Sequence, residues 1–314
     1  MDNIIGNCDY AKTLEIGTTE YLFTGLFVIS IIYSIPSIYI TFKIVTKIQA
    51  NNKRFPSVFY KLFLHDRLVT LLLFIIDITL VRVPQTGLVT SVICRIPHGY
   101  YLTALYVMCY YLLYTGLYSS IVISIVRVAA VLSPVEADKI QIRIALFLIP
   151  AMYLLPCVTT WFLVPVHAYF ATISNSASLV MAYKKVYPAW RSSLALLFVT
   201  TITCLIVLLC FMVTMIRWRI LLGRTTKTWN KSERSLLLLV CSLCGSIGLF
   251  CLLQFFFYYE IFYEISFLLR GFLQDMMVFI PTWVFYFTHP FFSKRVVVSS
   301  FTITVVPASK SSNK

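Results

Sequence analysis

The sequence has little charge, and that absence excludes an ordinary soluble protein. Only 12% of its 314 residues are charged, and just 12 residues are acidic. A soluble domain usually contains about 25% charged residues. The hydrophobic fraction is 60%, which is more than a soluble core of this length can bury.

The sequence also lacks the patterns that mark metal sites and enzymes. Cys241 and Cys244 have a Cys-x-x-Cys spacing, but they lie in an apolar stretch without ligand partners. The histidines are scattered without metal-ligand spacing: His65, His98, His167 and His289. No nucleophile motif precedes a helix. We therefore expect no catalytic residues, no metal, no cofactor and no enzyme activity.

The first 20 residues show no cleavable signal peptide, because a basic head, a short apolar run and a small-residue cleavage site are absent. The first apolar segment is expected to serve as the insertion signal. No repeat of 20–50 residues and no matched pair of broken transporter helices is visible.

What the sequence has in abundance is long apolar segments. A helix needs about 20 apolar residues to cross a bilayer. Seven segments qualify, at residues 21–42, 58–81, 101–126, 144–164, 192–216, 235–258 and 267–288. The sequence therefore predicts an all-α integral membrane protein, a seven-transmembrane helix bundle. We expect an extracellular amino-terminal arm at 1–20, the bundle at 21–292 and a cytoplasmic Ser-rich tail at 293–314.

The basic residues are unevenly distributed between the connecting segments. Most of the 26 Lys and Arg residues fall on one side of the seven segments. Such connections face the cytoplasm, so the amino terminus is expected outside, in a multi-pass protein of the plasma membrane. The net charge of +14 could also indicate nucleic acid. Its confinement to short segments between apolar runs favours the lipid bilayer as partner and excludes nucleic acid.

Two of the nine cysteines, Cys8 and Cys94, fall outside the apolar segments on the expected outer side. Because that compartment is oxidising, a Cys8–Cys94 disulfide is a reasonable hypothesis. The alternative is two free thiols.

Several local strings resemble the nematode serpentine receptors of class gamma. The strings are Ile32-Tyr-Ser-Ile-Pro36, Phe59-Tyr-Lys-Leu-Phe-Leu-His-Asp66, Asp77…Arg82, Arg127-Val-Ala-Ala-Val-Leu-Ser-Pro134, Ser232-Glu-Arg-Ser235 and Asp275…Pro281. The resemblance covers about 22–295, and a sister class of the same superfamily would also fit. It implies a G-protein-coupled-receptor-like chemosensory receptor on a sensory cell, including its cilium, that binds a small molecule and signals through a heterotrimeric G protein.

Two departures limit what the resemblance implies. Val126 stands where the family usually has an asparagine before the third-segment arginine, and the Gly-Gly-Phe string is missing from 165–190. The ligand therefore does not carry over. A ligand-gated channel subunit or small-solute carrier is the alternative function.

Carboxylates inside the membrane are costly and mark functional interiors. Asp66 and Asp77 are eleven residues apart and share a helix face. With Asp275 of the seventh segment they would form a polar core. The alternative is simple ion pairing, for instance Asp77 with Arg82 or Asp66 with Lys61.

The third segment is rich in tyrosine and is expected at the centre of the bundle. Tyr110, Tyr114 and Tyr118 recur every four residues and form one stripe. We expect Tyr106 and Tyr110 to line a ligand cavity, and Tyr118 to pack between helices. Asp77 and Arg82 complete the candidate ligand site. Arg82 belongs to a group of outer cations that would suit an anionic ligand or are solvated loop charges.

Basic residues at the cytoplasmic side are candidates for G-protein coupling. Arg127 follows the third segment, where rhodopsin-like receptors keep an arginine that engages the G protein; it could equally be a positive-inside anchor. The connection between the fifth and sixth segments adds Arg219, Arg224, Lys227 and Lys231. These cations could dock an acidic protein surface or anionic lipid headgroups.

Overall fold

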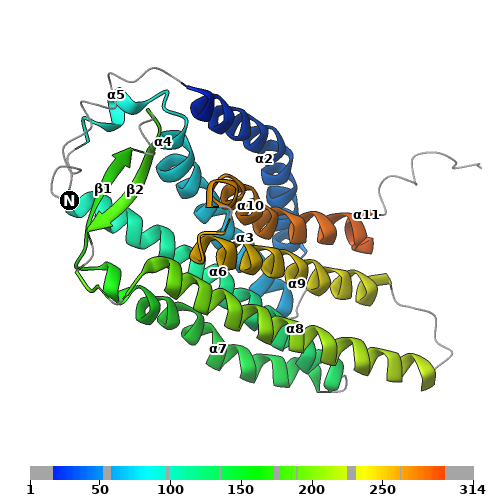
Figure 1. Cartoon of the computed structure of the whole chain (residues 1–314). Helices are drawn as coiled ribbons and strands as arrows, with labels where there is room; N and C mark the ends of the chain where they lie inside the picture. Colours follow the sequence, from blue (N-terminus) through cyan, green and yellow to red (C-terminus); the bar gives the residue numbers. More distant parts are fainter. Residues whose placement is uncertain are drawn as a thin grey trace, which may run out of the picture.

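The computed structural model describes residues 17–51, 58–96, 99–133, 136–172, 177–184, 186–188, 190–224, 231–261 and 263–293. Within them, seven helices are long and apolar enough to cross a membrane. They are α2 (Thr18–Ala50), α3 (Val58–Asp77), α6 (Tyr100–Leu132), α7 (Ala137–Thr160), α8 (Ser192–Arg224), α9 (Lys231–Tyr258) and α10 (Tyr263–Thr288). The predicted seven-transmembrane helix bundle is confirmed (Figure 1).

The helices extend past the apolar segments that predicted them. α2 runs eight residues beyond position 42, and α8 continues to Arg224. Backbone hydrogen bonds continue to propagate a helix after the hydrophobic stretch has ended, because each added residue contributes one more bond. Hydropathy therefore locates the membrane-spanning part and underestimates the helix.

The start of α2 shows why the boundary predicted at residue 21 is too late. Glu20 is buried and lies within the helix. Its carboxylate accepts a hydrogen bond from the Gly17 backbone N–H at 2.9 Å and from the Ala177 N–H at 2.7 Å. Glu20 is thus part of the bundle. Residues 1–16 and those after 293 lie outside the described residues, so the rest of the arm and the tail stay predictions.

The end of α3 departs from regular α-helix. The chain continues as a π-helical turn, η2 (Ile78–Arg82), and then as α4 (Val83–Gln85). Pro84 lies in α4, and its ring clashes with the carbonyl four residues earlier in a regular helix. A widened turn just before Pro84 relieves this clash. Such π turns are frequent at functional sites.

The segment 165–190, which connects the fourth and fifth apolar segments, contains a β-hairpin. Strand β1 (His167–Thr172) pairs antiparallel with β2 (Leu179–Lys184), with His167 opposite Lys184 and Thr172 opposite Leu179. The Thr103 hydroxyl of α6 donates to the Val166 carbonyl at 2.9 Å and accepts from the Ala168 N–H at 3.1 Å. The hairpin is therefore fixed to the end of α6.

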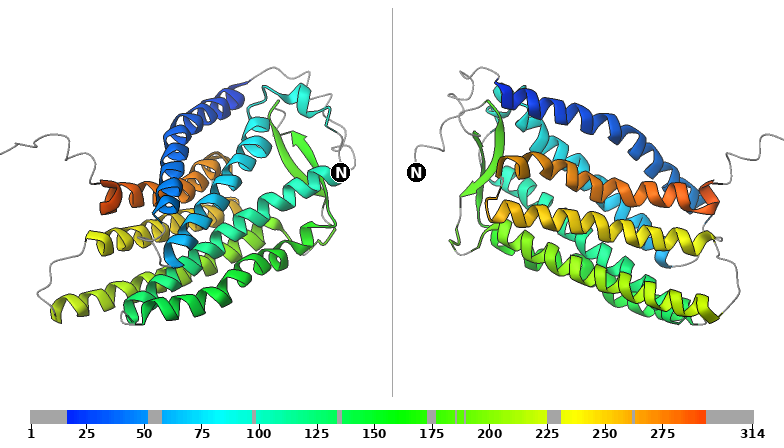
Figure 2. Two further views of the ribbon diagram at one scale, coloured as in Figure 1. Left: turned by 180° about the vertical axis from the view of Figure 1, so that it is seen from behind. Right: turned by 45° about the vertical axis from the view of Figure 1, so that its right-hand side comes forward.

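Short elements complete the fold: α5 (Thr90–Ile93), η3 (Trp161–Leu163) and α11 (Pro290–Ser293). The hairpin crosses one end of the bundle, beside the start of α2, and α11 lies at the other end (Figure 2). We call these the hairpin end and the tail end.

α6 is the central helix. It packs against α3, α7, α8 and β1. Its apolar window is 61% buried, whereas that of α7 is 17% buried, so α7 presents most of its surface outward. A helix surrounded by others connects the two ends of the bundle directly.

Candidate functional site

A cavity of about 540 Å³ lies beneath the hairpin. Residues of α2, η2, α6, both strands, α8, α9 and α10 line it. All four residues predicted from the sequence to bind ligand are among them: Tyr106, Tyr110, Asp77 and Arg82. The structure brings these four together from two segments, and their role in binding stays a proposal.

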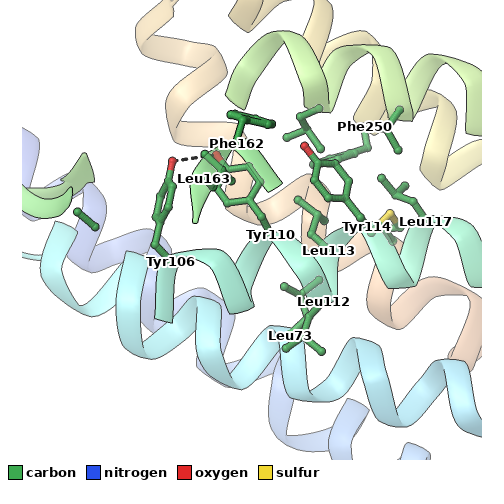
Figure 3. Packing of buried hydrophobic residues seen from close by; sticks show 14 of the residues in the cluster. Leu73, Tyr106, Tyr110, Leu112, Leu113, Tyr114, Leu117, Phe162, Leu163 and Phe250 are labelled. Atoms are coloured by element: carbon green, nitrogen blue, oxygen red, sulfur yellow. Dashed lines mark hydrogen bonds between the residues drawn. The ribbon is translucent and has the colours of Figure 1, made fainter. Parts of the chain in front are cut away.

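Tyr106, Tyr110 and Tyr114 follow one another along α6 (Figure 3), and the first two line the cavity. The hydroxyls of Tyr106 and Tyr110 are 3.4 Å apart, and the Tyr106 ring lies 5.6 Å from the ring of Tyr183 in β2. Tyr114 is fully buried one turn deeper. Tyr118 packs against both large hydrophobic clusters of the core, which supports the interpretation that it joins helices.

Arg82 is held by two carboxylates. Its Nε donates to Asp77 Oδ2 at 2.7 Å, its Nη1 to Asp275 Oδ2 at 2.6 Å, and its Nη2 to Asp275 Oδ1 at 2.5 Å. Nη2 also donates to the Gly271 carbonyl at 3.1 Å, and Tyr33 of α2 donates to Asp275. We call Asp77, Arg82 and Asp275 the Arg82 triad.

The π turn explains how Arg82 reaches Asp77. Five residues separate them, and in an α-helix side chains meet at spacings of three or four. A π turn closes its hydrogen bonds from i to i+5. Arg82 therefore lies on the same face of the helix as Asp77, one turn further along. Ion pairing between Asp77 and Arg82, one of the alternatives raised by the sequence, is thus observed. Arg82 is not a free cation at the mouth of the bundle.

Asp66 forms a second, separate cluster. It pairs with its neighbour Arg67 and accepts a hydrogen bond from Ser119 of α6. Arg67 also donates to the Val278 carbonyl at 2.6 Å and to the Thr282 hydroxyl at 3.2 Å. Among the described residues, Arg67 is thus the link between Asp66 and α10.

These contacts correct two expectations. Asp66 and Asp275 do not share one polar core, because each belongs to its own cluster. Arg67 joins the first cluster from α3 to α10, and Arg82 joins the second from η2 to α10. The cation that pairs with Asp66 is Arg67, whereas Lys61 is exposed. Eleven helical residues separate Asp66 from Asp77 by about 16 Å, which is too far for one set of hydrogen bonds.

Several further polar residues line the cavity, and the sequence predicted neither Arg270 nor Gln254 among them. Arg270 of α10 and Gln254 of α9 line it. The Arg270 guanidinium lies 5.9 Å from the centre of the Phe257 ring, and Gln254 Nε2 is buried without a hydrogen-bond partner among the described residues. A signal existed for Arg270, since it falls inside the seventh apolar segment, where an ionisable residue is unusual.

The tail end holds the residues predicted to couple to a G protein. Arg127 is partly buried, and its Nε has no hydrogen-bond partner among the described residues. Arg219 of α8 and Lys231, the first residue of α9, are exposed. Arg224 is the last residue of α8, and Lys227 lies outside the described residues.

His289 lies between helices at the same end. Its Nε2 is 3.3 Å from the Tyr60 hydroxyl of α3 and 3.3 Å from the Ser232 hydroxyl of α9. Burial lowers the pKa of His289 from 6.5 to about 4, because the charged imidazolium loses its hydration. The side chain is therefore neutral at physiological pH.

Cys94, between α5 and α6, is disulfide-bonded in the structure. Its predicted partner, Cys8, lies outside the described residues, so the pairing stays a prediction.

Residues 18–295 match the family model described as "Serpentine type 7TM GPCR chemoreceptor Sru". A relative, Serpentine receptor class U-26 of Caenorhabditis elegans, is 26% identical over 184 residues, which are 56% of this chain and 63% of the relative. The chain thus spans less than two thirds of that relative's length. The predicted serpentine receptor is confirmed, but the gamma class is not. This chain belongs to the Sru family of serpentine seven-transmembrane chemoreceptors.

Proposed function

We propose that this protein is a chemosensory receptor that binds a small external molecule in the cavity beneath the hairpin and signals through a heterotrimeric G protein. The cavity is the observation that carries the proposal. Its volume of about 540 Å³ falls within the range of small-molecule sites, about 300–1,000 Å³. Its wall combines aromatic side chains with a few charged and polar groups, as such sites do.

The hairpin end faces the exterior in this proposal, in the plasma membrane of a sensory cell and its cilium. The excess of Lys and Arg in the connections at the opposite end supports this orientation. An epitope tag at the amino terminus is expected to bind antibody on unpermeabilised cells, and a tag at the carboxyl terminus only after permeabilisation. The reverse pattern would reject the orientation and, with it, the receptor.

α6 connects the proposed ligand site to the proposed coupling site. Tyr106 and Arg127 lie in this one helix, and the 21 residue steps from one to the other span about 30 Å. A ligand that contacts Tyr106 and Tyr110 can bias the position of the whole helix. It shifts the population towards an active state only by its difference in affinity for the two states.

At the tail end, Arg127 is the proposed contact with the G protein. Its Nε has no partner among the described residues, so the guanidinium can donate hydrogen bonds to carbonyls of an inserted segment once the helices separate. Arg219, Arg224, Lys227 and Lys231 add positive charge for an acidic surface, or for the lipid headgroups beside it.

The coupling role is tested with Arg127→Ala in cells that report both G-protein activation and membrane current during a ligand screen. We expect normal surface expression and strongly reduced G-protein activation. Arg143→Ala is the matched control, because Arg143 is an exposed cation of α7. Normal coupling by Arg127→Ala would remove this role. A current that persists without a G protein would favour the channel alternative.

A further inference from the structure

The charges around the cavity are not equally available to a ligand. In the Arg82 triad, Arg82 is 8% exposed, Asp77 6% and Asp275 2%. Every nitrogen of the Arg82 guanidinium already donates to a carboxylate or to Gly271. The triad is therefore an internal structural unit that offers little to an incoming molecule.

Arg270 differs from Arg82 in this respect. It is partly exposed and lines the cavity. Among the carboxylates whose side chains the structure describes, none lies within ion-pair distance of it. Its electrostatic neighbours are the Tyr110 and Tyr106 hydroxyls and the Asp77 carboxylate, and of these Tyr110 is a hydrogen-bond partner. A guanidinium has five N–H donors, and one phenol oxygen accepts at most two of them. Several donors remain available on the cavity side.

Gln254 adds a second unpaired donor. It is 2% exposed, and its Nε2 has no partner among the described residues. A buried amide without a partner is unfavourable, because it has lost its hydrogen bonds to water. Both Arg270 and Gln254 line the same cavity, from adjacent helices. The N–H groups of Arg270 that Tyr110 does not accept, together with the Gln254 amide, match a ligand group that has only acceptors.

Large apolar side chains make up a continuous part of the wall, between its polar groups. Phe23 and Phe27 come from α2, Leu113 from α6, and Phe267 and Phe272 from α10. Such a surface holds a hydrocarbon body by burying its apolar area.

We propose that the cavity binds a small organic acid, with its carboxylate or other oxyanion on Arg270 and Gln254 and its apolar body against the aromatic side chains of α2 and α10. This inference rests on the proposed function, since it names the class of ligand for that site. A charge-assisted pair between guanidinium and oxyanion is among the strongest of hydrogen-bonded contacts. It would give the ligand both orientation and selectivity over neutral or cationic molecules.

The test is binding to the purified full-length chain, measured as the shift of its thermal midpoint with concentration. Octanoate, octanol and octylamine are the probes, because they share one hydrocarbon chain and differ in the head group. We expect octanoate to raise the midpoint most and octylamine not to raise it. Octylamine giving the larger shift, or octanoate giving none, overturns the proposal.

Variants of Arg270 test whether its guanidinium binds the carboxylate of octanoate. Arg270→Gln is expected to weaken octanoate binding by about 10- to 100-fold, as loss of a charged hydrogen bond does, and Arg270→Lys by less. Arg191→Gln is the control, because Arg191 is exposed and does not line the cavity. Equal binding by wild type and Arg270→Gln overturns the proposal.

Gln254→Leu separates a ligand contact from a structural one. Removing an unpaired buried amide should leave the midpoint without ligand unchanged or higher, whereas octanoate should bind several-fold more weakly. A variant that is less stable yet binds octanoate normally contradicts the role of Gln254. All these measurements read binding alone, so a receptor that signals to another ligand without binding octanoate refutes this inference and leaves the proposed function standing.

Discussion

The guanidinium of Arg82 donates two hydrogen bonds, of 2.5 and 2.6 Å, to the carboxylate of Asp275, which lies 193 positions later in the sequence. This pair fastens the π turn after α3 to α10. Both side chains are buried. Removing one partner of a buried ion pair leaves an uncompensated charge and costs about 3–5 kcal/mol.

The Arg82 triad should therefore respond unequally to loss of its members. Arg82→Gln leaves two carboxylates without their cation, and we expect it to lose the most stability, about 3–5 kcal/mol. Asp275→Asn should lose less, because Asp77 still balances Arg82. Asp77→Asn should lose about 1–2 kcal/mol, since only one hydrogen bond is weakened. Thermal unfolding of the purified variants gives the order.

Arg95→Gln is the control for the triad, because Arg95 is an exposed arginine. It should unfold as the wild type does, within about 0.5 kcal/mol. If Asp77→Asn proved as damaging as Arg82→Gln, the idea that Asp275 is the main partner would be wrong.

The Asp66 cluster gives a second prediction. Asp66→Asn leaves the buried Arg67 without its counter-charge, and we expect a loss of about 3–5 kcal/mol. Ser119→Ala removes one hydrogen bond to Asp66 and should cost about 1–3 kcal/mol. Lys61→Gln, at the exposed cation once considered as the partner, should have no effect. Surface expression and thermal unfolding measure all three, and stability of Asp66→Asn equal to wild type would contradict the role of the cluster.

His289 predicts a dependence of stability on pH. Its pKa is about 4 in the folded protein against 6.5 as the ordinary value, so the unfolded chain binds a proton first as the pH falls. His289 therefore leaves the free energy of unfolding unchanged above pH 6.5 and lowers it as the pH falls from 6.5 towards 4. At pH 5 the loss is about 2 kcal/mol. In His289→Gln the side chain does not titrate. The thermal midpoint of this variant should therefore decline less steeply between pH 7.5 and pH 5 than that of the wild type.

The disulfide at Cys94 gives a fourth prediction. Peptide mapping without reductant should recover Cys94 linked to Cys8. Cys94→Ser and Cys8→Ser should each cost about 2–4 kcal/mol, because the cross-link no longer restricts the unfolded chain. The double variant should lose no more than either single one. Additive losses would show that the two cysteines are not partners.

Much of the site was visible in the sequence as separate parts. The four-residue spacing of the tyrosines predicted a stripe on α6, because helical geometry is local. The charged residues in apolar segments marked Asp66, Asp77 and Asp275 as interior. The sequence did not predict all the residues that pair with these carboxylates. Arg67 is adjacent to Asp66 in a helix, where neighbours normally point apart, and only the long arginine side chain allows it to fold back.

The sequence predicted neither the hairpin nor the hydrogen-bond donors of the cavity. Segment 165–190 has no strong strand pattern, and its strands are fixed by contacts such as Thr103 with Val166. Arg270 lies within an apolar segment, and the sequence does not show which surface of the helix it occupies. Whether such a residue faces lipid, water or a cavity depends on which helices surround it.

By itself the sequence determined that the chain crosses the membrane seven times, because the transfer of about 20 apolar residues into lipid depends on composition and hardly on neighbours. It also determined which side chains resist that transfer. The tertiary structure alone decided how those side chains are compensated: Arg82 reaches Asp275 through a π turn, and Arg270 and Gln254 are left facing a cavity. Such pairings join residues distant in the chain, and their energies exist only after the helices have packed.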